Sequence, residues 1–156
     1  MATRKLIIAA LCCGLAILLA GGLWLVASGK DDAKTSPLLE AGQQAKVGGL
    51  GVTVLGGALD GQELVLTVEG VVPEGGSTVD DFAAGWSVVS PTGVKLIRAA
   101  DREVALDVPP CSTQRLEPGA TAQCFMLFTL DSPQPSVAGF TTVYSRENDI
   151  AAWLLQ

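Results

Sequence analysis

The feature that most constrains this chain is a series of short apolar runs from about residue 46 onward, separated by turn-forming residues. Within the second run, Leu64, Leu66 and Val68 fall on one side of an extended chain, whereas Glu63 and Thr67 fall on the other. Alternation with a period of two residues is typical of a strand with one buried face. The spacing predicts an all-β protein with seven to eight short strands in an antiparallel sandwich. The predicted strands cover residues 50–54, 64–68, 86–89, 94–98, 104–108, 121–130, 140–144 and 151–155.

Glycines mark the boundaries of the first two runs. Asp60-Gly61 lies between them, and Asp-Gly is a strong β-hairpin signal. Gly56-Gly57 lies just before this turn and predicts an interruption of the first strand.

A run of 22 residues without a charged side chain extends from Leu6 to Ala27. About 20 apolar residues cross a bilayer as a helix, and the preceding Arg4 and Lys5 are typical of an export signal. We interpret this run as a transmembrane signal anchor that contacts the membrane in a single pass. A signal peptide cleaved after Ala27 or Ser28 is the alternative, and it would give a freely secreted domain.

The anchor divides the chain into four parts. Residues 1–5 form a cytoplasmic tail, residues 6–27 the anchor, residues 28–45 a polar flexible linker and residues 46–156 an extracytoplasmic domain. Cys12 and Cys13 lie inside the anchor, either as small apolar side chains or as acylation sites.

The sequence contains no histidine, which excludes Ser-His-Asp and Cys-His catalysis and the common histidine-ligated metal sites. Its formal net charge is −6, which argues against nucleic-acid binding because phosphate contacts need clustered cations. We therefore expect a non-enzymatic protein with no cofactor, no catalytic residues and no nucleic-acid partner.

Cys111 and Cys124 are the two cysteines of the predicted domain, and the turn signal Glu117-Pro118-Gly119 lies between them. A pair of cysteines in an exported domain is usually a disulfide. If the intervening segment joins two paired strands, the thiols can meet. We predict a structural disulfide between these two residues.

Two stretches carry a family resemblance: LEPG at 116–119 followed by CFMLFTL at 124–130, and WSVVSPTG at 86–93. They resemble the turn-and-strand signature of telokin-like bacterial extracellular domains, among them the immunoprotective extracellular protein family. The resemblance implies a short immunoglobulin-like sandwich behind a signal sequence or lipid anchor. It implies no activity. Cys111 and Cys124 depart from the immunoglobulin pattern, because they are too close in sequence to bridge strands B and F.

Large aromatic side chains and loop carboxylates are the remaining candidate site residues. Trp86 and Trp153 are interpreted as core residues or, alternatively, as surface or pocket aromatics that contact a ligand. Acidic residues occur in two predicted loops, and no EF-hand spacing is present, so no metal site is predicted from them. The acidic residues concerned are Glu74, Asp80, Asp81, Asp101 and Glu103.

Together these features favour a membrane-tethered, extracytoplasmic, non-enzymatic interaction module of the bacterial cell envelope. Its partner would be another envelope protein, contacted through loops and sheet edges. The alternative is an envelope carrier domain for a small ligand or a metal. A pocket lined by Trp86 or Trp153 with convergent carboxylates would favour the carrier, and an exposed apolar surface would favour the interaction module.

Overall fold

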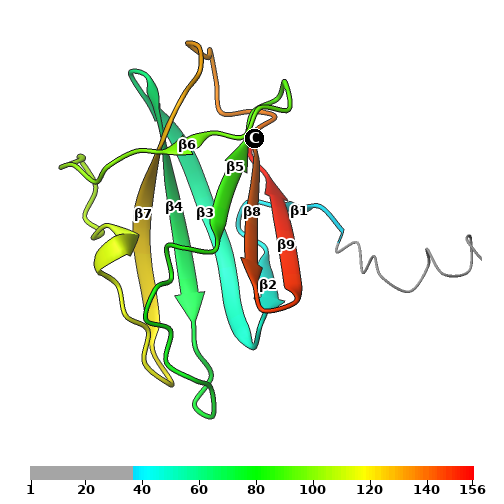
Figure 1. Ribbon diagram of the computed structural model, residues 1–156, viewed down its shortest axis with the longest axis vertical. Coiled ribbons are helices and arrows are strands. Elements are labelled where there is room, and N and C mark those ends of the chain that lie inside the picture. The colour runs from blue at the N-terminus through cyan, green and yellow to red at the C-terminus, as the bar shows by residue number, and fades with distance from the viewer. Residues whose placement is uncertain (1–36) are drawn as a thin grey trace, which may run out of the picture. The chain divides into compact units, whose positions relative to one another are not determined.

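The computed structural model describes residues 37–156 (Figure 1). The predicted cytoplasmic tail and anchor, with Cys12 and Cys13, lie outside the described residues, as does the predicted linker up to residue 36. Within residues 37–156, no helix has the length and apolar character needed to cross a membrane.

In residues 37–156, nine strands form two sheets that pack on each other as a β-sandwich (Figure 1). One sheet has the order β1-β9-β8-β5, and the other has the order β2-β3-β4-β7-β6. The strands are β1 (Leu39–Glu40), β2 (Gln44–Val47), β3 (Leu50–Asp60), β4 (Glu63–Val71), β5 (Trp86–Val89), β6 (Ile97–Arg98), β7 (Thr121–Thr129), β8 (Thr141–Arg146) and β9 (Asp149–Leu154). A short 3-10 helix, η1 (Cys111–Thr113), precedes β7.

The strand order is that of an immunoglobulin domain. Strands β3, β4, β7 and β6 lie in the order of immunoglobulin strands A, B, E and D, and β5, β8 and β9 lie in the order C, F and G. Neighbouring strands within both sets are antiparallel. Two short strands are added at the N-terminal end, where β1 pairs in parallel with β9 and β2 pairs antiparallel with β3. The predicted immunoglobulin-like antiparallel sandwich is confirmed.

The predicted hairpin at Asp60-Gly61 is confirmed. Asp60 pairs with Glu63, and Gly61 occupies the turn with φ of 65°, a conformation that glycine adopts without steric cost. The predicted interruption at Gly56-Gly57 is wrong, because β3 continues through both glycines to Asp60. The chain accommodates them with a register shift between Val54 and Gly56, as in a β-bulge.

The strand predicted at residues 104–108 does not form. Its alternating apolar residues, Val104 and Val108, instead pack as part of a loop against the outer face of the β3-β4-β7 sheet. Alternation reports which side chains are buried, and a loop that crosses a sheet face produces the same pattern as a strand.

The folded domain begins earlier than residue 46. The linker was predicted to extend to Ala45. Instead, Leu39 pairs with Trp153 in the sheet, and the backbone carbonyl of Gln43 accepts a 2.8 Å hydrogen bond from Trp153 Nε1. A two-residue strand is too short to show a period, and its partner lies at the far end of the sequence. Composition alone could not reveal this pairing.

The core between the two sheets contains a cluster of large aromatic side chains. The ring centroid of Trp86 lies 4.7 Å from that of Tyr144 and 5.8 Å from those of Phe82 and Trp153. Trp153 is fully buried and Trp86 nearly so. The interpretation of Trp86 and Trp153 as surface or pocket aromatics is therefore wrong, and the core interpretation describes both. Their rings fill the space between β5, β8, β9 and the opposite sheet.

Replacing Trp153 by alanine should lower the free energy of unfolding by about 3–5 kcal/mol, because the change removes a fully buried ring and leaves a cavity. Urea unfolding of the full-length protein in detergent micelles measures the loss. The Ile150→Ala variant is the control, since Ile150 is 58% exposed and its truncation should cost no more than about 0.5 kcal/mol. Equal losses in the two variants would contradict the assigned core.

Candidate functional site

The segment between β6 and η1, residues 99–110, crosses the outer face of the five-stranded sheet, and we call it the strap (Figure 1). Both of its ends are attached to β7. The N–H of Ala99 donates to the carbonyl of Leu127, and the N–H of Phe125 donates to the carbonyl of Pro109. The strap therefore leaves the edge of β7, passes over the sheet and returns to the same strand.

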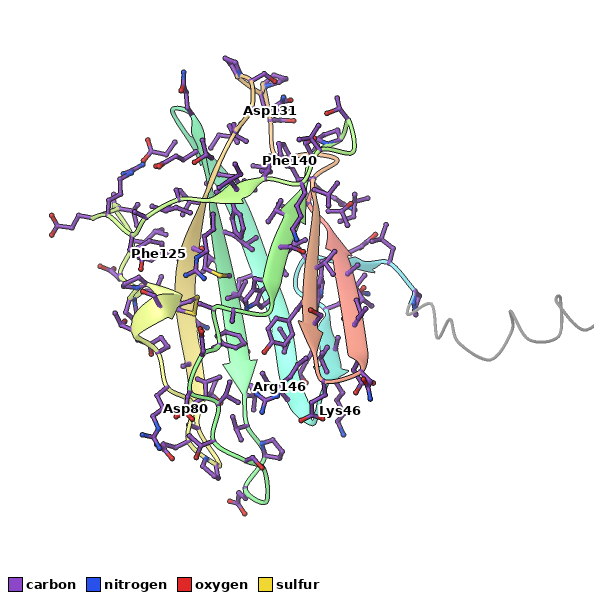
Figure 2. The ribbon with its side chains drawn as sticks, viewed as in Figure 1. Lys46, Asp80, Phe125, Asp131, Phe140 and Arg146 are labelled. Atoms are coloured by element: carbon purple, nitrogen blue, oxygen red, sulfur yellow. A yellow bond between two sulfur atoms is a disulfide. The ribbon has the colours of Figure 1, made fainter. Side chains whose placement is uncertain are left out.

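Apolar side chains on the outer face of the sheet explain why the strap is there. Val65, Phe125 and Leu127 are buried on this face, and Val104 and Val108 of the strap pack against them. Phe125 projects from β7 toward the strap (Figure 2). Residues 124–128 form a continuous buried run, the pattern of a strand that is covered on both faces. This second apolar cluster is separate from the core between the sheets.

Arg102 fixes the strap to the β3–β4 hairpin. Its guanidinium lies 2.7 Å from the carboxylate of Asp60 and 2.7 Å from that of Glu63. Hydrogen bonds to Asp60 and then to Glu63 raise the pKa of Arg102 above its ordinary value. The arginine therefore remains charged, and it forms ion pairs with two carboxylates beside the turn.

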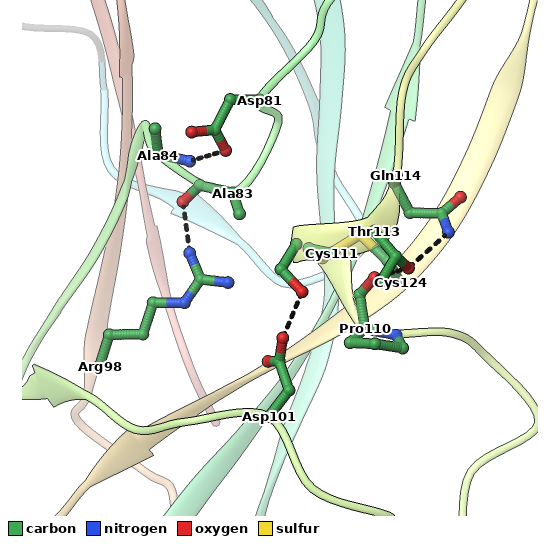
Figure 3. The surroundings of a disulfide bond; sticks show 11 residues. Asp81, Ala83, Ala84, Arg98, Asp101, Pro110, Cys111, Thr113, Gln114 and Cys124 are labelled. Atoms are coloured by element: carbon green, nitrogen blue, oxygen red, sulfur yellow. Dashed lines mark hydrogen bonds between the residues drawn. A yellow bond between two sulfur atoms is a disulfide. The ribbon is translucent and has the colours of Figure 1, made fainter.

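The predicted disulfide between Cys111 and Cys124 is confirmed, and it fixes the other end of the strap (Figure 3). The two Cα atoms are 4.9 Å apart. The bridge joins η1 to β7 rather than two strands of a hairpin, because Pro110 meets Phe125 through a parallel bridge. The Ser112 hydroxyl donates to the carboxylate of Asp101 in the strap.

Beside the strap lies an open hollow of about 420 Å³, which we call the strap groove. Its floor is the outer face of β3 and β4, and its wall is the strap. Leu55 and Leu106 line it and are 39% and 43% exposed, respectively. The remaining groove residues used below are Gly56, Ala58, Val65 and Thr67. Leu106 on the strap and Leu55 on β3 are exposed beside the small residues Gly56 and Ala58, and together they form a surface suited to apolar side chains of a partner.

Gly56 keeps the floor of the strap groove open. A Cβ atom at this position would have no neighbour within 4 Å, and the backbone φ lies outside the left-handed region that favours glycine. Glycine inside a strand costs about 0.5–1 kcal/mol relative to alanine. Glycine in a strand often marks a β-bulge, such as the one between Val54 and Gly56, or a close approach by another backbone.

The same part of β3 has an open edge. Strand β2 pairs with β3 only over Leu50–Thr53, and the carbonyl of Val54 accepts a hydrogen bond from the N–H of Gly42. Within residues 37–156, no backbone hydrogen bond reaches residues 55–59 of β3 from the side away from β4. The strap groove and this open edge therefore lie on the same short stretch of strand.

A second hollow of about 400 Å³ lies on the other side of Val104 and Leu106. It is lined by Asp101 and Glu103, two of the carboxylates considered from the sequence, and by Phe125. Arg102 also lines this second hollow, and Asp60, the one acidic residue that lines the strap groove, is paired with Arg102.

The other sequence-predicted carboxylates do not converge on a site. Asp80 forms an ion pair with Arg115, and Asp81 accepts a hydrogen bond from the N–H of Ala84. Glu74 lies in the loop after β4. No group of three potential metal ligands occurs within the described part of the chain.

Tyr144 and the two tryptophans offer no reactive surface group. Burial raises the pKa of Tyr144, and the nearby charge of Arg146 partly offsets this effect. The phenol is therefore neutral near pH 7. Trp86 and Trp153 line neither the strap groove nor the second hollow.

The strap groove was missed by sequence reasoning. The sequence prediction placed Leu106 in a strand, ended the first strand before Leu55 and interpreted Gly56 as part of an interruption. The continuous apolar run at residues 124–128 was the available signal, because it indicates that β7 needs a cover on both faces.

Comparison with solved structures agrees with the fold. The YjhA protein of Bacillus subtilis superposes with a TM-score of 0.56 at 11% identity, over 76% of this chain and 100% of that protein. MPT63, a secreted protein of Mycobacterium tuberculosis, superposes with a TM-score of 0.56 at 12% identity, over 78% of this chain and 99% of that protein. No protein-family model and no curated protein matches the sequence. The chain therefore shares a sandwich fold with small bacterial proteins.

Removing the disulfide with the double variant Cys111→Ala/Cys124→Ala should lower the free energy of unfolding by about 3 kcal/mol, as expected for a short closed ring. Urea unfolding of the full-length protein measures the loss. The Cys12→Ala/Cys13→Ala variant is the matched control, because these cysteines lie outside the domain. An unchanged midpoint in the Cys111/Cys124 variant would show that the bridge does not stabilise the fold.

Replacing Arg102 by methionine should loosen the strap, because it leaves Asp60 and Glu63 unneutralised beside the hairpin. The amides of Ala99 and Phe125, which hold the strap ends, should exchange their hydrogens faster, and added salt should reduce the difference between variant and wild type. Hydrogen exchange followed by mass spectrometry measures this. Arg115→Met is the control, since Arg115 pairs with Asp80 and Glu117 away from the strap. Unchanged exchange at Ala99 and Phe125 would show that Arg102 does not hold the strap in place.

Proposed function

We propose that this protein is an extracytoplasmic, non-enzymatic interaction module that is tethered to the bacterial membrane and binds another envelope protein. The observation that carries the proposal is the strap groove, an apolar hollow in which Leu55 and Leu106 remain exposed although the strap is fixed at both ends. An anchored strap that leaves Leu106 exposed beside Leu55 and Gly56 of β3 provides a preformed binding surface.

Three observations support the placement outside the cytoplasm. The Cys111–Cys124 disulfide suits an oxidising compartment. The uncharged segment at residues 6–27 is long enough for a membrane anchor. MPT63, which shares the fold, is a secreted protein. The resemblance to the immunoprotective extracellular protein family points to the same location.

The chemistry of the described residues supports a role in binding rather than catalysis. The sequence offers no histidine as a general base. Asp60, Glu63 and Asp80 are engaged by arginines, and Tyr144 is held in its neutral form by burial. A carrier function would be favoured by a tryptophan-lined pocket, and both candidate tryptophans instead lie in the core. The exposed groove therefore favours the interaction module.

Site-specific photocrosslinking in intact bacterial cells tests this function. With benzoylphenylalanine in place of Leu106, the full-length protein should form a discrete adduct with one envelope protein. The same probe in place of Ile150, which is exposed in the other sheet, should not. Absence of an adduct at Leu106, or identical adducts at both positions, would contradict the proposal.

The same preparation tests the tether. The intact mass of the membrane-bound protein should include residues 1–36. A mass that lacks the first 27 or 28 residues would show that the domain is released instead.

A further inference from the structure

We propose that the strap groove binds its partner by strand addition: an extended segment of net positive charge, with apolar residues at alternate positions, pairs with the open edge of β3 at residues 55–59. This inference rests on the proposed function and specifies the chemistry of the partner. It is carried by three features of the same short stretch, namely the open edge, the open space over Gly56 and the exposed leucines, and by the net negative charge of the domain.

The open edge supplies the backbone groups that an added strand needs. Asp60 and Glu63 flank a two-residue hairpin loop, where the closing residues form a hydrogen-bonded pair. Alternation along an antiparallel ladder then directs the N–H and C=O groups of Gly57 and Leu59 away from β4. Within the described residues these groups have no backbone partner, so an incoming strand can bond to both.

The groove accommodates the side chains of such a strand. Alternate side chains of a strand beside β3 would fall on the outer face of the sheet, above Gly56 and Ala58. The open space over Gly56 gives the first of these side chains room, and Leu55 and Leu106 provide apolar contacts at its sides. Strand addition in general takes its affinity from main-chain bonds and its specificity from pockets for alternate side chains.

Charge favours a basic partner over a second copy of this chain. Residues 37–156 contain six lysines and arginines and 14 aspartates and glutamates, a net charge of −8. Glu69 lies two residues after Thr67 in β4 and therefore on the same, outer face of the sheet. Glu103 and Asp107 lie exposed on the strap. None of these three is in an ion pair in the described part of the chain. Two copies of this negatively charged domain would repel each other, whereas a segment of net positive charge would be attracted to it.

A random library of peptides of about eight residues, the length of a typical strand, tests the inference when selected against the full-length protein in nanodiscs. The enriched peptides should carry apolar residues at alternate positions and a net positive charge. When one of them binds, hydrogen exchange at the amides of Gly57 and Leu59 should slow about tenfold or more. A version of the same peptide with methylated backbone nitrogens keeps its charge and apolar character but should not bind, because it cannot donate to β3.

The Gly56→Val variant should weaken peptide binding by about tenfold or more, because its side chain occupies the floor of the groove. The fold should be unaffected, since no atom lies within 4 Å of the added Cβ. Gly75→Val is the matched control, because a Cβ at Gly75 also meets open space, in the loop after β4. Unfolding curves that coincide for both variants ensure that any loss of binding comes from the groove.

Several results would overturn the inference. These are enrichment of no peptide, enrichment of acidic peptides, binding that survives Gly56→Val or backbone methylation, and unchanged exchange at Gly57 and Leu59. Self-association that slows exchange at these amides would make a second copy the occupant and would also overturn it. The peptide experiment and the crosslinking experiment can fail independently. A selected peptide can slow exchange at Gly57 and Leu59 even if a probe at Leu106 crosslinks to no envelope protein. Conversely, a Leu106 crosslink that Gly56→Val leaves unchanged would refute strand addition alone.

Discussion

The burial of β7 on both of its faces is the constraint on which the rest of the structure depends. A strand of a sandwich normally has one face toward the core and one toward solvent, and its sequence alternates accordingly. Residues 124–128 instead form an unbroken apolar run, so the outer face of the sheet needs its own cover. The strap provides it with Val104 and Val108, and the strap groove exists because that cover ends before it reaches Leu55.

The disulfide has a different task here from the one it has in antibody domains. There, a bridge between strands B and F passes through the core beside a tryptophan on strand C. Trp86 lies on the corresponding strand, β5, but it packs against Tyr144 and Trp153. Cys111 and Cys124 belong to the same buried core cluster as these rings, and their bridge also fixes the end of the strap to β7. One covalent link therefore contributes both to the core and to the shape of the outer surface.

The parts of the fold predicted from sequence were those with local causes. Asp60-Gly61 between two apolar runs favours a tight turn, and Gly61 lies in that turn. Cys111 and Cys124 are the only two cysteines of the predicted domain, and they pair with each other. The parts that failed depend on distant partners. Leu39 becomes a strand residue because Trp153 lies beside it, and residues 104–108 become a loop because Val65 and Phe125 lie beneath them. The groove could not be predicted for a related reason. The role of Gly56 depends on its backbone conformation and on the open space beside it, and both are set by the fold.

An open strand edge is ordinarily a hazard, because it can pair with any extended chain, including another copy of the same protein. Proteins commonly protect such edges with charges placed on the strand itself. Residues 55–59 of β3 carry none, and the acidic residues lie instead on the strap and on β4. This arrangement keeps like-charged copies apart at a distance while it leaves the edge itself small and apolar. A domain of net negative charge that keeps these backbone groups accessible admits an oppositely charged strand more readily than another copy of itself.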